Sequence, residues 1–258
     1  MGFKPYFASS SKVWEDISWV YGIEEAGYAG WEISADGKYR LDNQVYNTAI
    51  RETLASTGLC ATVHAPYSDL NLAAINHQIW DVSIRQICTC ISCASEITDT
   101  ITFHPGYLGP TGKLIPDKVW ELQKRALQEI SKTAEEYGVR ACLENMPAIP
   151  DLLCQNPYEL EGLTEGLEGI GITVDIGHAH TTGWEKSFYP FISNADHLHI
   201  HDNHGASDEH LPIGSGTIVW ETIAQLISAS YSREIIVIEG RNIHDAEISL
   251  KAFQRWFT

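Results

Sequence analysis

Short runs of β-branched and aromatic residues alternate with longer helical patterns along the whole chain. Eight strand-like runs cover residues 5–8, 29–33, 60–64, 100–104, 140–144, 170–175, 197–201 and 234–239. The helical patterns lie near residues 12–26, 43–57, 77–97, 116–137, 157–167, 186–193, 219–230 and 245–257. Such alternation is typical of βα units around a parallel sheet. Eight units in about 250 residues predict an α/β fold, a closed (β/α)8 TIM barrel.

Residues at the ends of several helical patterns support these assignments. Ser11 can cap the first helix, and Asn156 followed by Pro157 is typical of a cap and first helical residue. Gly138 is placed to end the fourth helix, because glycine readily adopts the left-handed conformation found there. The sequence therefore marks both ends of some of the predicted elements.

The length and composition of the chain favour one domain, residues 1–258. Its 258 residues with 44% hydrophobic content can form a substantial core, and no Pro-, Gly- or Ser-rich linker divides them. Residues 8–11 read Ala-Ser-Ser-Ser, so no Gly-rich phosphate-binding turn follows the first strand. A Rossmann-type nucleotide site is therefore not supported.

The strong negative charge limits the partners that we expect. Lys and Arg number 17 against 34 Asp and Glu, a formal net charge of −17 that repels phosphate backbones. Duplex DNA is disfavoured but not excluded, since bound cations or a local basic patch could reverse the field. No window reaches the roughly 18 apolar residues of a membrane span. We expect a cytoplasmic protein with no membrane partner, and its oligomeric state is open.

Acidic and imidazole side chains recur where the predicted strands end. They are Glu32, His64, His104, Glu144, Asp175, His199 and Glu239, with His178, Asp208 and His210 in the loops that follow. The carboxyl ends of barrel strands converge on one face, so these groups can meet there. Burying several carboxylates together is costly unless cations compensate. The pattern predicts a metal site at this face.

The donor types indicate which metal to expect. Mixed imidazole and carboxylate ligands favour Zn, Mn, Fe or Co, whereas Ca and Mg prefer shells made of oxygen. Other histidines are assigned to supporting or solvent-facing positions rather than to ligands. These are His180, His197, His201 and His204.

Taken in order, the strand-end motifs resemble those of the xylose-isomerase-like TIM barrels, a group that includes sugar isomerases, epimerases and endonuclease IV enzymes. The resemblance covers nearly the whole chain. Its carriers are Trp31-Glu32, Val-His-Ala-Pro at 63–66, Phe-His-Pro-Gly at 103–106, Leu-Glu-Asn at 143–145, Asp-Ile-Gly-His at 175–178, His-Ile-His-Asp at 199–202, Asp-Glu-His-Leu-Pro-Ile-Gly-Ser-Gly at 208–216 and Ile-Glu at 238–239.

The resemblance implies two possible metal centres. In the epimerases and isomerases one divalent ion is held by residues that match Glu144, Asp175, His199 and Glu239, and the two glutamates also move protons. In the endonuclease IV branch three zinc ions are held by a larger set. That set matches His64, His104 and Glu144 for the first ion, Glu144, Asp175, His199 and Glu239 for the second, and His178, Asp208 and His210 for the third. All nine positions carry the expected residue types, so one to three ions (Zn, Mn or Co) are implied.

These observations favour an isomerase or epimerase that acts on a sugar or sugar phosphate through an enediolate, with Glu144 and Glu239 as the catalytic base and acid. Glu32, His178 and Arg241 are candidate substrate contacts, although Glu32 could instead hold a loop and Arg241 could pair with a neighbouring acid. The complete nine-residue set keeps an endonuclease IV-like zinc phosphoesterase as the alternative. A non-catalytic metal-binding module is the third reading.

Overall fold

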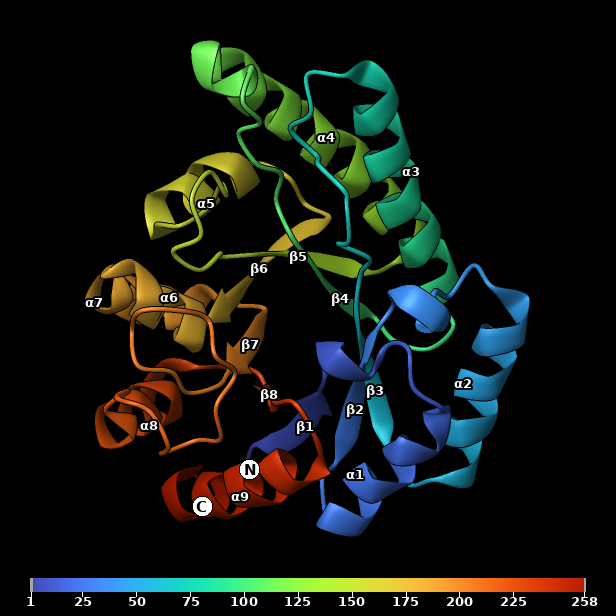
Figure 1. Cartoon of the computed structure of the whole chain (residues 1–258), viewed down its shortest axis with the longest axis vertical. Helices are drawn as coiled ribbons and strands as arrows, with labels where there is room; N and C mark the ends of the chain where they lie inside the picture. Colours follow the sequence, from blue (N-terminus) through green and yellow to red (C-terminus); the bar gives the residue numbers. More distant parts are fainter. Residues whose placement is uncertain (1, 258) are drawn as a thin grey trace.

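Eight parallel strands form a closed barrel with the neighbour order β1 to β8 in the computed structural model, which describes residues 2–257 (Figure 1). The strands are β1 Lys4–Ala8, β2 Gly30–Ser34, β3 Cys60–His64, β4 Thr100–Phe103, β5 Arg140–Glu144, β6 Ile170–Asp175, β7 His197–Ile200 and β8 Ile235–Glu239. β1 pairs with both β2 and β8, which closes the sheet. The predicted (β/α)8 TIM barrel is confirmed. The single domain of residues 1–258 stays a prediction, and its two end residues lie outside the described range.

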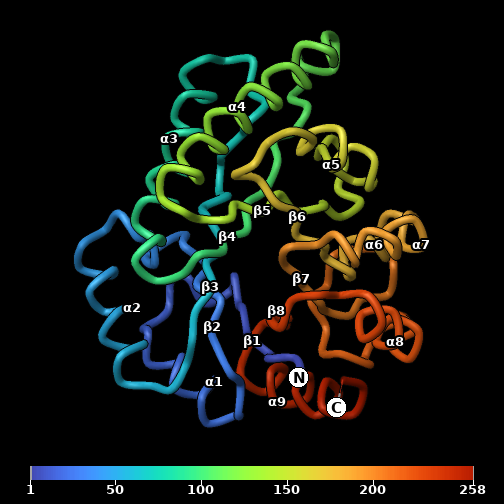
Figure 2. Tube along the Cα trace, turned by 180° about the vertical axis from the view of Figure 1, so that it is seen from behind, coloured from blue at the N-terminus to red at the C-terminus, as the bar shows by residue number. Residues whose placement is uncertain are grey.

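Helices surround the barrel on its outer side (Figure 2). They are α1 Tyr21–Ala26, α2 Gln44–Ser56, α3 His77–Ala94, α4 Pro116–Tyr137, α5 Pro157–Thr164, α6 Ile176–Thr182, α7 Glu185–Phe188, α8 Trp220–Ser230 and α9 Ile243–Phe257. Within residues 2–257, none of the helices combines the length and the apolar character needed to cross a lipid bilayer. Both views place the chain ends side by side, beside β1 and α9.

The structure differs from the prediction in the first and sixth βα units. The expected helix at 12–26 is divided into the 3-10 turns Ser10–Lys12 and Ile17–Val20 and the short α1. Ser11 caps no helix, because its hydroxyl donates a hydrogen bond to the carbonyl of Arg241. After β6 the chain turns directly into α6, which we did not expect. By contrast, Asn156 accepts a hydrogen bond from the backbone N–H of Glu159, and Gly138 ends α4 with φ 65° as predicted.

Apolar side chains fill the space between strands and helices, whereas polar side chains occupy much of the barrel interior. In α4 the buried residues Val119, Leu122, Ala126 and Ile130 recur at helical spacing, so one stripe faces the sheet. Inside the barrel, Thr102 of β4 and Thr173 of β6, the strands on either side of β5, hydrogen-bond at 2.8 Å. The interior is therefore polar below the carboxyl ends of the strands, where buried carboxylates require partners.

Candidate metal centre

Four predicted ligands from the ends of β5, β6, β7 and β8 lie together at the carboxyl end of the barrel. Nδ1 of His199 is 3.0 Å from Oε1 of Glu144 and 3.2 Å from Oε1 of Glu239. Asp175 completes the group, in which one donor atom of each residue lies within 4.8 Å of the others. All four side chains are buried. This arrangement suits a single divalent ion.

A second group joins the ends of β3, β4 and β5. Nε2 of His64 and Nε2 of His104 lie 3.1 Å apart, and both face Oε2 of Glu144, at 3.4 and 3.0 Å. Glu144 therefore presents one oxygen to this group and the other to His199. A carboxylate divided in this way can bridge two ions.

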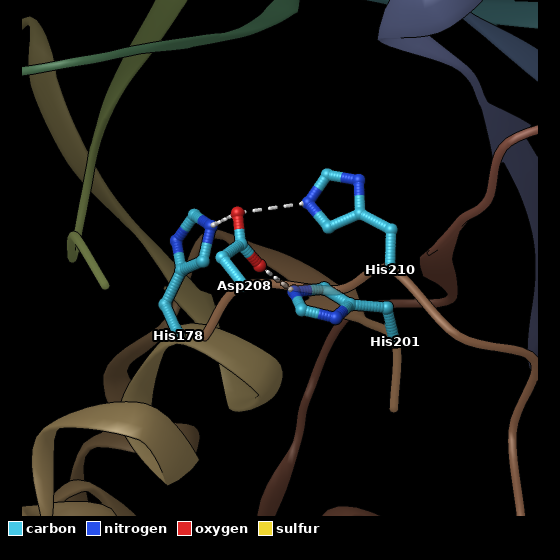
Figure 3. A group of neighbouring side chains, drawn as sticks. All are labelled: His178, His201, Asp208 and His210. Carbon is cyan, nitrogen blue, oxygen red and sulfur yellow. Dashed lines mark ion pairs between the residues drawn. The ribbon is translucent and has the colours of Figure 1, made fainter. Parts of the chain in front are cut away.

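A third group contains His178, Asp208 and His210, as the resemblance implied, and also His201 (Figure 3). His178 comes from α6, His201 follows β7, and the other two belong to the loop that leads to α8. The sequence pattern predicts a supporting or solvent-facing position for His201, whereas the structure places it in this donor group. The alternation of side chains along a strand could have indicated it, since His201 lies two residues after His199 and so on the same side.

Several donor atoms at these groups are buried without a hydrogen bond among the described residues. They are Oε1 of Glu144, Oδ2 of Asp175, Nδ1 of His199, Nε2 of His201, Oδ1 of Asp208 and Nε2 of His210. Nδ1 of His199 lies 3.0 Å from Oε1 of Glu144, and Nε2 of His201 lies 3.2 Å from Oδ1 of Asp208, but neither pair has the alignment of a hydrogen bond. Buried polar atoms are nearly always satisfied. Orphaned lone pairs on mixed imidazole and carboxylate donors fit a divalent cation.

Hydrogen bonds to the backbone fix the orientation of two histidine rings. Nδ1 of His64 donates to the carbonyl of Ala65 at 2.9 Å, and Nδ1 of His178 donates to the carbonyl of Asn145 at 2.8 Å. In each neutral ring, Nε2 is then left as the acceptor that points into the cluster. Metal-binding histidines commonly have such a partner on the second nitrogen.

The electrostatics of the centre balance buried carboxylates against imidazoles. Burial would raise the pKa of Glu144, but the charge of His199 and the close approach of the His104 and His199 imidazoles, each 3.0 Å from a Glu144 oxygen, hold that pKa well below its usual range. Burial would lower the pKa of His199, yet Glu32 and Glu144 raise it well above the usual value. Protons on the histidines therefore compensate the carboxylates when no cation does so, and a bound ion would replace them.

Glu32 does not lie where a substrate contact was expected. Its side chain is fully buried, and its Oε1 is 3.0 Å from Nε2 of His199. Its Oε2 accepts hydrogen bonds at 2.9 Å from Nε2 of His197 and from the Thr62 hydroxyl. Glu32 therefore contacts the candidate ligand His199 and is not among the residues that line the cavity.

Arg241 also lies outside the cluster. Its Nε donates to Asp245 at 3.0 Å, four residues further on, and the side chain is half exposed. The pairing with a neighbouring acid, one of the two alternatives considered for this residue, is the one that the structure contains. Arg241 is not among the residues that line the cavity at the metal centre.

A cavity of about 250 Å³ at the carboxyl ends of the strands opens onto the second and third groups and onto Glu144 and Glu239 of the first group. Its lining includes His64, His104, Glu144, His178, Asp208, His210 and Glu239. One side is apolar and comes from Met146, Ile149 and Leu152 of the β5–α5 loop. None of the described residues that line it is Lys or Arg. Larger hollows open beside Lys4 and Arg51 at the opposite end of the barrel, but away from the clustered donors.

The closed barrel and the donor groups at its carboxyl end place the protein in a class: (β/α)8 barrels with candidate metal ligands at the strand ends. A family model described as xylose isomerase-like TIM barrel matches residues 20–257. The chain belongs to the xylose isomerase-like TIM barrel family.

Individual relatives agree with this assignment. An uncharacterized protein of Methanocaldococcus jannaschii is 34% identical over 234 residues, which are 87% of this chain and 78% of the relative. A solved structure named D-tagatose 3-epimerase-like protein is 31% identical with a TM-score of 0.89, covering 99% of this chain and 97% of its own. A Thermus thermophilus protein soaked with ZnCl2 is 22% identical with a TM-score of 0.75, covering 99% and 98%, and shows the fold alone.

Proposed function

We propose that the protein is a divalent-metal-dependent epimerase or isomerase of a small sugar. The observation that carries this proposal is the cavity of about 250 Å³ whose lining includes both Glu144 and Glu239. Sites for drug-sized molecules occupy roughly 300–1,000 Å³, so a cavity just below that range suits a monosaccharide rather than a duplex. The similarity to a D-tagatose 3-epimerase-like protein supports the same class.

Glu144, Asp175, His199 and Glu239 would hold the ion, and Zn, Mn and Co all suit this donor set. When bound, the ion supplies positive charge that stabilises the negative charge developing on a sugar oxygen. Glu144 and Glu239 stand at the ends of β5 and β8, on different sides of the lumen. One carboxylate would accept the proton from the carbon beside the carbonyl, and the other would return it.

The lining also bears on the kind of sugar. A bound phosphate group usually contacts Lys, Arg or backbone N–H groups. Because no described lining residue is Lys or Arg, and Arg241 is paired with Asp245, we favour a neutral sugar over a sugar phosphate. The apolar side chains of the β5–α5 loop would exclude water from the reacting carbon.

Phosphoester hydrolysis is a second candidate, because Glu144 lies between two donor groups. Its two oxygens face His199 on one side and His64 and His104 on the other, as a bridging ligand would. A carboxylate bound to two ions is less free to move a proton. The zinc-soaked Thermus structure has the same fold, and the complete set of nine ligand positions supports this alternative.

One experiment separates the two activities. The purified protein is incubated with Mn²⁺, Co²⁺ or Zn²⁺ in D₂O together with ketohexoses, and proton NMR follows deuterium incorporation beside the carbonyl and the formation of the epimer. We expect exchange that Glu239→Gln abolishes and that Glu247→Gln, an exposed control on α9, leaves unchanged. Cleavage of an abasic-site duplex without any sugar exchange would overturn the proposal in favour of the hydrolase.

A further inference from the structure

His178, His201, Asp208 and His210 form a compact group in which one carboxylate faces three imidazoles (Figure 3). Oδ2 of Asp208 lies 3.4 Å from Nε2 of His178 and 3.1 Å from Nε2 of His210. Oδ1 of the same residue lies 3.2 Å from Nε2 of His201. All three rings therefore present the same nitrogen to one small volume.

His201 is the most enclosed member of the group. Its side chain has no solvent exposure, and its Nε2 is buried without a hydrogen bond among the described residues. Nδ1 lies 3.3 Å from the backbone carbonyl of Asp202, to which it can donate. The ring therefore has its proton directed away from the cluster and its free acceptor directed into it, the arrangement of a metal ligand.

The local backbone leaves space for this ring. A Cβ added to Gly177 would collide with the ring of His201, so only glycine fits there. The amide of Asn203 also donates to the Gly177 carbonyl at 2.8 Å, which ties α6 to the segment after β7. Glycine at position 177 thus allows the His201 ring to lie directly against the backbone of α6.

We propose that these four residues bind one zinc ion as a closed site, with His201 as a fourth protein ligand in addition to His178, Asp208 and His210. Zinc sites with four protein ligands are tetrahedral and structural, whereas catalytic sites keep a position open for water or substrate. An ion held by four side chains has no position left to activate water. The proposal rests on the metal-binding part of the proposed function, but not on its sugar chemistry.

The ion would fix the loop between β7 and α8 over the mouth of the barrel. Two of its ligands, Asp208 and His210, belong to this loop, and His210 has a positive φ of 48°. A non-glycine residue in this region is strained, and coordination would compensate for the strain. The carboxylate of Asp202 already organises the base of the loop through the backbone N–H of Gly214 and the indole of Trp220, both at 2.8 Å.

The test measures metal content and loop order rather than turnover. Full-length protein loaded with Zn²⁺ is dialysed, its zinc is counted by mass spectrometry, and the loop is probed by limited proteolysis. His201→Asn should lose one equivalent of zinc, with affinity at that site reduced by roughly 100-fold or more, since losing even an outer partner of a ligand costs about 10–100-fold. Cleavage between residues 203 and 219 should become faster.

Two further variants complete the test. Gly177→Ala should reproduce the loss of one zinc by displacing the His201 ring, although none of the four ligand residues is substituted. His204→Asn changes an exposed histidine of the same loop, bound to Glu209, and should keep the full zinc content.

The outcomes separate this inference from the proposed function. Full zinc content and unchanged affinity in His201→Asn would show that His201 is not a ligand. Wild-type protein that binds zinc only through His64, His104 and the group around His199 would overturn the closed site and leave the proposed function intact. If the protein bound no divalent metal at all, both proposals would fail.

Discussion

At the level of single residues, the donor groups depend on partners that lie outside the cavity. His199 has Glu32 behind it, and Glu32 in turn contacts His197 and Thr62. A carboxylate on the far nitrogen of a ligating histidine orients the ring and increases its basicity. Glu32 thus contacts a candidate ligand without lining the cavity, which its place in the sequence did not reveal.

We predict that Glu32→Gln weakens metal binding by about 10–100-fold, because the amide keeps the size of the side chain and loses its charge. Competition against a chromogenic chelator measures the change. Glu52→Gln, an exposed substitution on α2, is the matched control. An unchanged metal affinity in folded Glu32→Gln would show that the carboxylate is not needed to hold His199. Thr62→Val, which removes one hydrogen bond to Glu32, should have a smaller effect.

A pH dependence follows from His210. Burial would lower its pKa, but Glu239 and Asp208 raise it to about 9 from 6.5. In metal-free protein this shift stabilises the fold fully below pH 6.5, and the contribution is lost as the pH rises through about 9. At pH 7 the ring is protonated, so zinc binding should release a proton. Calorimetric titration in two buffers with different ionisation enthalpies measures that proton, and identical heats would contradict the prediction.

At the level of helices and strands, the ends of the elements are set by local chemistry. α4 stops at Gly138 because the chain there has φ 65°, which glycine adopts without strain. α6 begins directly after Asp175, which caps it: Oδ1 of Asp175 accepts a hydrogen bond from the backbone N–H of His178 at 2.7 Å. The same carboxylate thus caps a helix with one oxygen and offers the other to the metal centre. The cap allows β6 to run into α6 without a loop, because Asp175 is both the last strand residue and the N-cap.

Two glycines should respond oppositely to the same substitution. Gly138→Ala should destabilise the fold by about 1 kcal/mol, because alanine is strained at positive φ. Gly162→Ala, in the exposed part of α5, should stabilise it by about 0.5–1 kcal/mol, since nothing lies near the added methyl group. Urea unfolding of both variants measures the difference. Equal effects of the two substitutions would contradict the role of Gly138 as a helix end.

At the level of the whole molecule, the closed barrel brings buried carboxylates from β5, β6 and β8 to one end. The chain carries a formal charge of −17, and three divalent ions would offset about six charges. Metal binding should therefore stabilise the native state as a whole, because the carboxylates that β5, β6 and β8 bring together exist as a cluster only in the folded chain.

Removal of metal should lower the melting temperature, and readdition of Zn²⁺ or Mn²⁺ should restore it. Each ion present at roughly 1,000 times its Kd contributes about 4 kcal/mol. Mg²⁺ should restore less, since it prefers ligands that are all oxygen. Thermal unfolding followed by circular dichroism, with and without a chelator, measures the shift. A melting temperature that is independent of these ions would argue against a tightly bound metal.

The fold and the main donor set could be predicted from residue order alone. Alternation of strand and helix patterns indicated a barrel, and a barrel brings strand ends such as those at Glu144 and Glu239 to one face whatever the details of packing. The approximate strand positions depended on local patterns of β-branched and apolar residues, and the structure agrees with them. The break in the first helix and the presence of α6 depended on capping groups whose effect the pattern did not reveal.

The tertiary structure alone decided which individual side chains contact each other. Glu32 and His199 stand at similar points on their strands, yet Glu32 is fully enclosed and contacts Nε2 of His199 inside the barrel at 3.0 Å. His201 joins the third group only because Gly177 leaves room for its ring, and Arg241 is directed towards Asp245 at the start of α9. The position of a residue in the sequence predicts which strand end carries it. Which atoms then meet depends on contacts between segments that are far apart in the sequence.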